Sequence, residues 1–140
     1  MSHARPVSTA GRSSRSVMVW RLLSALALLA MGGIHLYLVL TSTGGVLGML
    51  FVLNALGGLV LAVAITVLHG RLLQVATVLG LLFMAGTLAA LVLALTVGLF
   101  GIESSLDYDL APTTLVVESV GTVVLLITTV LVLRTSRVPR

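Results

Sequence analysis

Three side chains able to take part in chemistry lie inside long apolar segments of this sequence: His35, Asn54 and Glu118. A histidine and a carboxylic acid can exchange a proton, and an asparagine amide can hydrogen-bond to either of them. Segments this apolar are typical of membrane helices, and lipid offers no hydrogen bonds. A polar side chain within them is therefore expected to face protein, water or a ligand. The three residues are the candidate intramembrane polar site.

His35 and Glu118 are the pair expected to meet. Each lies about five residues, or ~7–8 Å at 1.5 Å per residue, from the same end of its helix. The functional interpretation is a proton-titrating dyad or a polar ligand pocket. The structural interpretation is a clasp between the first and fourth helices, or a Glu118 hydrated near the interface. We take the structural interpretation as the default.

The residue types missing from the chain exclude several kinds of function. It has no cysteine, which excludes disulfides, thiolate metal sites and cysteine catalysis within this chain. Its histidines are few and scattered, and His35 and His69 are expected at opposite membrane faces, too far apart to hold one haem. A nucleophile–base set and a phosphate-binding loop are also missing. We therefore expect a protein that is not an enzyme and has no metal or cofactor.

The elements that must position the polar residues are four apolar stretches. Each is long enough to cross a hydrocarbon core ~30 Å thick, which takes about 20 helical residues. Only 9% of the 140 residues are charged, against about 25% in a soluble domain. The predicted fold class is all-α, a membrane four-helix bundle. The stretches cover residues 18–40, 45–68, 72–100 and 113–133.

Three divisions of the chain are expected on this basis. Residues 1–17 are rich in serine and arginine and have no apolar period, which predicts a disordered basic tail. Residues 18–134 form the four-helix transmembrane domain. Residues 135–140 form a short basic tail.

The arginines predict an orientation. All eight basic residues are arginines, and they lie before or at the start of the first stretch, between the second and third, and after the fourth. The connections 41–45 and 101–112 carry none. Basic residues accumulate on the cytoplasmic side, so both termini are expected in the cytoplasm of a bacterium, with the protein in its plasma membrane. Arg21, beside Trp20, is expected to be an interface anchor. Arginines placed in this way do not indicate nucleic-acid binding.

The loop between the third and fourth stretches is acidic. Glu103, Asp107 and Asp109 lie in it. We expect a solvated outer loop, and docking of a basic partner to it remains an alternative.

Two helices carry polar residues on one side. At 100° per residue, Arg21, Ser24 and His35 fall within an arc of about 60°. The fourth stretch has a comparable stripe, which predicts a shared polar interior. Its members are Thr114, Glu118, Gly121, Thr122 and Thr129.

The third stretch has small residues at four-residue spacing: Gly86, Ala90, Ala94 and Gly98. Small residues let two membrane helices approach closely. This series is the predicted helix-packing seam.

Three segments carry a resemblance to a known group. They are GGIHLYLVL (32–40), LFVLNALGGLVLA (50–62) and GLFGIESSLDYDLAPTTLVVES (98–119). They resemble small, uncharacterised four-helix integral membrane proteins of GC-rich Gram-positive bacteria. The resemblance implies a shared fold and implies that His35, Asn54 and Glu118 belong to a family pattern. It implies no activity.

These observations favour a non-enzymatic accessory or interaction subunit of a larger membrane complex, in contact with the lipid bilayer and with a protein partner or further copies of itself. The alternative is a small oligomeric transporter or proton or ion conductor that uses His35, Asn54 and Glu118. A third hypothesis is a quinone or cofactor binder with His35 and Tyr37 as polar contacts.

Overall fold

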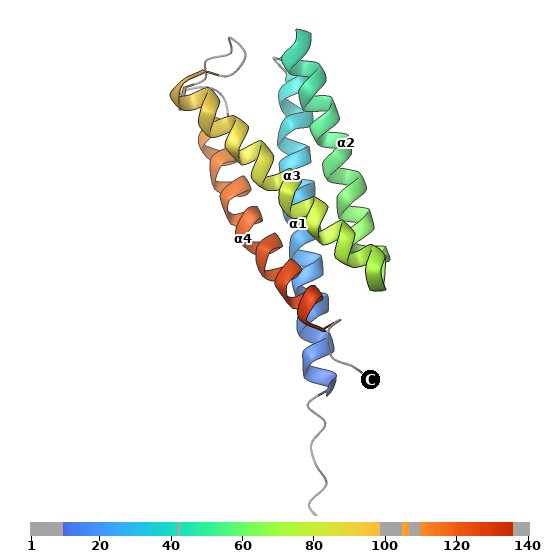
Figure 1. Ribbon diagram of the computed structural model, residues 1–140. Coiled ribbons are helices and arrows are strands. Elements are labelled where there is room, and N and C mark those ends of the chain that lie inside the picture. The colour runs from blue at the N-terminus through green and yellow to red at the C-terminus, as the bar shows by residue number, and fades with distance from the viewer. Residues whose placement is uncertain (1–9, 42, 99–104, 107–109, 136–140) are drawn as a thin grey trace, which may run out of the picture.

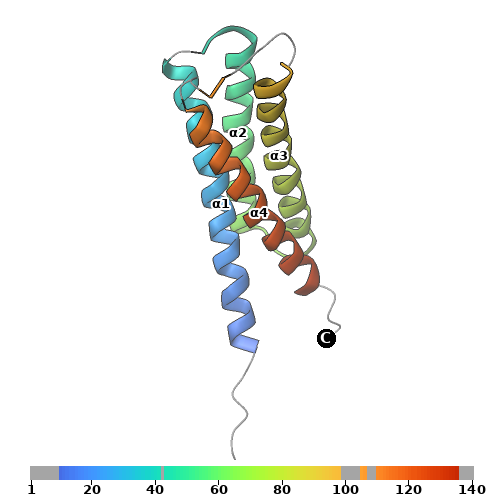
Figure 2. The same ribbon diagram turned by 90° about the vertical axis from the view of Figure 1, so that its left-hand side faces the viewer.

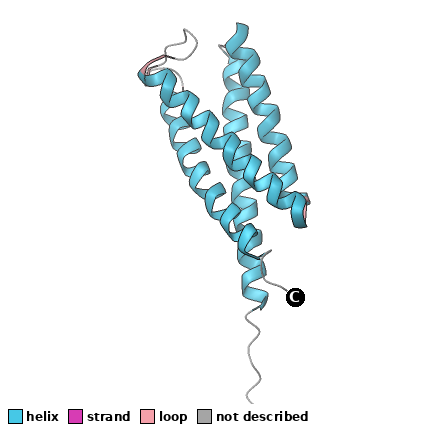
Figure 3. Cartoon of the chain, viewed as in Figure 1, coloured by secondary structure: helices cyan, strands magenta, loops and turns pink. Residues whose placement is uncertain are grey.

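The computed structural model describes residues 10–41, 43–98, 105–106 and 110–135 (Figure 1). The secondary structure of these residues is helical (Figure 3). The predicted all-α four-helix fold is confirmed, and each helix is long and apolar enough to cross a membrane. The helices are α1 (Ala10–Thr41), α2 (Gly45–Val67), α3 (Gly70–Thr96) and α4 (Ala111–Thr135).

The start of α1 differs from the prediction. The helix begins at Ala10, eight residues before the expected boundary, so the segment 10–17 is part of α1. Arginine, alanine and serine are compatible with a helix, and no proline follows Pro6 before the helix ends. The polar start of α1 extends beyond the other helices (Figure 1).

The helices run alternately up and down and contact one another unequally. The pair α1–α2 has the most extensive contact, α3–α4 and α1–α4 follow, and α2–α3 has the least. Figure 1 shows the pairs α1–α2 and α3–α4 separating toward the end of the bundle that carries the α1–α2 turn, and Figure 2 shows α4 crossing α1. The helices α2 and α3 are therefore neighbours from their short turn to about their midpoints, where Gly57 faces the ring of Phe83.

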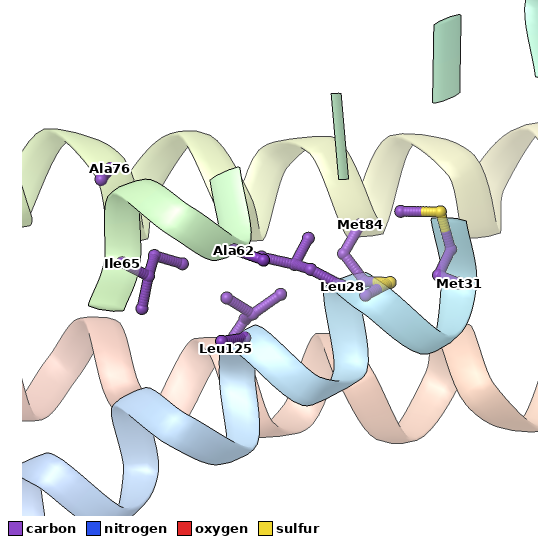
Figure 4. Packing of buried hydrophobic residues seen from close by; sticks show 8 residues of the cluster. Leu28, Met31, Ala62, Ile65, Ala76, Met84 and Leu125 are labelled. Atoms are coloured by element: carbon purple, nitrogen blue, oxygen red, sulfur yellow. The ribbon is translucent and has the colours of Figure 1, made fainter. Parts of the chain in front are cut away.

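The core is a small apolar cluster to which all four helices contribute (Figure 4). Because lipid is as apolar as the core, this packing is stabilised by dispersion and close fit rather than by removal of surface from water. The apolar side chains of this cluster that have no exposed surface are Leu28, Met31, Ile65, Met84 and Leu125.

The predicted seam on α3 is not used within this bundle. Gly86 is exposed, and a Cβ placed on it would meet nothing within 4 Å. Ala90 and Ala94 are only half-buried, and Gly98 lies beyond the end of α3 with φ +79°. Residues four apart advance by about 400°, so each step drifts about 40° around the helix. The four residues therefore spread over about 120° of the helix, and their use as a seam toward another chain stays a prediction.

Other small residues make the close approaches. A Cβ on Gly58 of α2 would lie 2.9 Å from the Leu28 carbonyl oxygen of α1, and one on Gly32 would lie 3.2 Å from that of Ala55. A Cβ on Gly80 of α3 would lie 3.1 Å from the Ile65 side chain and 3.3 Å from that of Leu125. The tightest backbone approach in the described bundle is thus between α1 and α2.

Candidate intramembrane polar site

His35 and Asn54 join α1 to α2. His35 is 6% exposed, its Nε2 lies 3.1 Å from Asn54 Nδ2, and its Nδ1 lies 2.9 Å from the Met31 carbonyl oxygen. The ring of Phe51, one turn before Asn54, packs edge-on against the imidazole with 4.8 Å between centroids. The structure therefore brings together two of the three predicted residues.

These contacts define the protonation of the imidazole. A carbonyl oxygen only accepts hydrogen bonds, so Nδ1 carries the hydrogen and donates it to Met31. Nε2 is then the acceptor for the Asn54 amide N–H, which is the arrangement of a neutral imidazole. Both ring nitrogens of His35 are occupied, and this part of the site is a satisfied interhelical clasp.

Glu118 lies apart from that clasp. Its side chain is only 1% exposed, within the membrane-spanning helix α4. Thr87 of α3 is its side-chain hydrogen-bonding neighbour. The second carboxyl oxygen, Oε2, has no hydrogen-bond partner among the described residues. The third predicted site residue therefore belongs to the α3–α4 interface, and the expected His35–Glu118 pair is not formed.

The register of the helices explains the separation. A Cβ on Gly121 of α4 would lie 3.3 Å from Ala27 Cβ of α1. The helices α1 and α4 are antiparallel, so moving from Gly121 back to Glu118 on α4 corresponds to moving forward from Ala27 to Met31 on α1. Met31 is therefore the α1 residue at the level of Glu118. His35 lies four residues further, a displacement of about 6 Å, and its ring faces α2.

The clasp between α1 and α4 uses hydroxyl groups instead. Ser24 Oγ and Thr128 Oγ1 are 2.7 Å apart and buried. Thr128 Oγ1 also faces the carbonyl oxygens of Trp20 and Val124, at 3.0 and 2.9 Å. Because carbonyls only accept, the Thr128 proton goes to them and Ser24 donates to Thr128. On the other side of α4, Thr129 Oγ1 donates to the Thr77 carbonyl of α3 at 3.1 Å.

Arg21 caps the C-terminal end of α2 and does not act as an anchor at the membrane interface. Its Nε donates to the Ile65 carbonyl and its Nη2 to the carbonyls of Thr66 and Leu68, each at 2.9 Å. The last carbonyls of a helix have no partner within it, and a cation at this end also interacts favourably with the helix dipole. Arg21 as a whole is 5% exposed, and its guanidinium is engaged in this cap.

The sequence contained part of the signal for these contacts. The arc on the first helix is buried as predicted, at Arg21, Ser24 and His35. The partners of its members were not predictable, because carbonyls of α2, Thr128 and Asn54 come opposite them only through the register of the helices. Glu103, Asp107 and Asp109 of the predicted acidic loop lie outside the described residues.

The fold and the site define a class, a multi-pass helical membrane protein with a polar interior. Comparison of the chain with known protein families, with curated proteins and with solved structures finds no match. Its function is therefore inferred from its own geometry.

Proposed function

We propose that this protein is a non-enzymatic accessory or interaction subunit of a larger complex in a bacterial plasma membrane. The observation that carries the proposal is the outer face of α3. Gly86 and Ala89 are exposed there, and the space above Gly86 is open. Larger exposed side chains, Leu82 and Leu93, flank them. A helix from another chain can approach closely at such a place, because small residues expose the backbone to contact.

The interior supports the same proposal. The hydrogen bonds of His35, Ser24 and Arg21 hold helices of this chain together. Groups engaged in this way stabilise a scaffold and are not free to bind a substrate. The bundle then serves its partner through its outer surface.

The orientation belongs to this proposal. The alternation of the helices brings the start of α1, the α2–α3 turn and the end of α4 to one end of the bundle (Figure 1). Arg15, Arg71 and Arg134 therefore lie toward the same end. By the excess of basic residues on the cytoplasmic side, that end and both termini are in the cytoplasm.

Native purification tests the proposal. The tagged full-length chain is extracted in a mild detergent, and the particle is analysed by native mass spectrometry. We expect larger subunits to copurify with the wild type and to be lost from Gly86→Leu, with the thermal stability of the chain itself unchanged. Gly33→Leu is the matched control, because Gly33 is also exposed with nothing within 4 Å but lies on α1. A chain that purifies without other subunits and is indifferent to Gly86→Leu contradicts the proposal.

One observation favours a second candidate function, a small oligomeric proton or ion conductor. Glu118 has a buried oxygen without a partner among the described residues, whereas His35 and Asn54 are engaged with each other. Conduction would therefore depend on Glu118 alone among the three predicted residues. Flux into vesicles that contain only this purified protein, abolished by Glu118→Gln and retained by Asn54→Leu, would favour the conductor over the subunit.

A further inference from the structure

The carboxyl group of Glu118 is buried in the bundle, and the described residues place no positive group against it. Oε2 has no hydrogen-bond partner among the described residues, and the whole side chain is 1% exposed. An ionised carboxylate in such a place needs a cation or several hydrogen-bond donors, because burial without them costs a large free energy. If Glu118 were ionised, a cation or several donors would have to lie beside its carboxylate.

The helices packed against this part of α4 do not supply a charge. On α3, Thr87 is the side-chain neighbour. The residues around Gly121, one turn along, are Met84 of α3 and Ala27 of α1, and Met31 follows on α1. The helices that pack extensively against α4 are α1 and α3, and α2 is not among them. The described surroundings of Glu118 are thus neutral on every side.

His35 and Arg21, the two buried side chains of α1 that could carry a positive charge, are engaged with other groups. Both nitrogens of His35 are engaged, with Met31 and Asn54. The Arg21 guanidinium caps the far end of α2. Neither side chain can reach the carboxyl group without breaking a clasp that holds the helices together.

We propose that Glu118 binds a proton in the interior of the bundle and is neutral in the structure described here. A protonated carboxyl group requires no counter-ion, and its O–H is a donor that the ionised form lacks. The proton is the ligand of this site, held between α3 and α4. The inference rests on the burial of one carboxyl group, so it holds whether the protein acts as a subunit or as a conductor.

A metal ion fits the site less well than a proton. Hard cations take about six or more oxygen ligands, and the described residues contain no group of three acidic, histidine or cysteine side chains that could hold one. Thr87 adds a single hydroxyl to the one carboxyl group. A cation site would require donors that the described helices do not present.

Infrared spectroscopy of the full-length protein in lipid vesicles tests the proposal. The chain has only four acidic side chains, and solvated carboxylic acids ionise near pH 4. At pH 7 we therefore expect one protonated-carboxyl carbonyl band per chain in the wild type and its complete loss in Glu118→Gln. The absence of this band from the folded wild type at pH 7 overturns the proposal, and so does its persistence in Glu118→Gln, since it then belongs to another acid.

A second measurement needs only the wild type, should Glu118→Gln fail to fold. A membrane-soluble carbodiimide adds to protonated carboxyl groups: the carboxyl oxygen bonds to the carbodiimide carbon and the proton moves to a carbodiimide nitrogen. Mass spectrometry of the vesicle-bound protein should find the adduct on Glu118 at pH 6–7, with less of it as the pH rises. A Glu118 peptide that is unmodified at pH 6 and equally unmodified at pH 9 overturns the proposal. A sodium-dependent loss of the band or the adduct at constant pH also overturns it, in favour of a cation site.

Discussion

At the scale of the residue, the contact between His35 and Asn54 is a measurable interaction. Interhelical hydrogen bonds in membranes are worth about 0.6 kcal/mol on average and up to about 1.7 kcal/mol. We expect Asn54→Leu and His35→Phe each to lower the free energy of unfolding by about 1 kcal/mol. Together they should cost less than the sum, because each change removes the same contact. Unfolding of the purified chain in mixed detergent measures the cycle. Strictly additive losses would show that the two side chains do not interact.

Arg21 supports a second prediction at this scale. Its three donor contacts at 2.9 Å satisfy carbonyls at the end of α2. A hydrogen bond to a charged group stabilises a protein by about 1.5–3 kcal/mol. Arg21→Met keeps the apolar stem and should destabilise the chain by about 2 kcal/mol, with faster modification of a cysteine at position 68. The control is Arg71→Met, since Arg71 is exposed and its loss removes a charge but no cap. Equal stability of the two variants would exclude the capping role.

At the scale of the element, two adjacent glycines of α1 make a matched pair. A Cβ on Gly32 would lie 3.2 Å from the Ala55 carbonyl oxygen of α2, whereas one on Gly33 would meet nothing within 4 Å. Gly32→Val should therefore force α1 and α2 apart and cost about 1–3 kcal/mol, the usual effect of overpacking, while Gly33→Val should have little effect. Both variants add the same side chain to the same turn, so a difference in melting temperature reports the contact and not helix propensity. Similar melting temperatures would mean that α1 and α2 do not approach each other at Gly32.

At the scale of the whole molecule, the orientation of the bundle is open to a direct test. The chain contains no cysteine, so single cysteines can be placed at the exposed positions Ser105 and His69. Intact cells treated with a membrane-impermeant maleimide should show labelling of Ser105→Cys, and His69→Cys should react only after permeabilisation. Labelling in the reverse pattern would place both termini outside and invert the proposed orientation.

The sequence by itself determined the number of helices, their approximate extent and which arcs are buried. This information is local. A long apolar segment in lipid must satisfy its backbone hydrogen bonds internally, which only a helix does along a single segment. The burial of Arg21, Ser24 and His35 follows similarly from one helix and its 100° period. The start of α1 at Ala10 was missed because serine and arginine are compatible with both a helix and a polar tail.

Only the tertiary structure decided which residues meet. Lipid and core are equally apolar, so the rotation and register of each helix depend on close packing and a few hydrogen bonds rather than on a general removal of surface from water. His35 lies about one turn, ~6 Å, beyond the level of Glu118, and its ring faces Asn54 of α2 instead. Gly86 follows Gly80 by six residues, which places it about 120° away around the helix, so Gly86 is on the outside of α3 while Gly80 packs inside. Within the described part of the chain Glu118 has no charged partner for the same reason. The register of three helices, and not the sequence of α4, determines what lies opposite its carboxyl group.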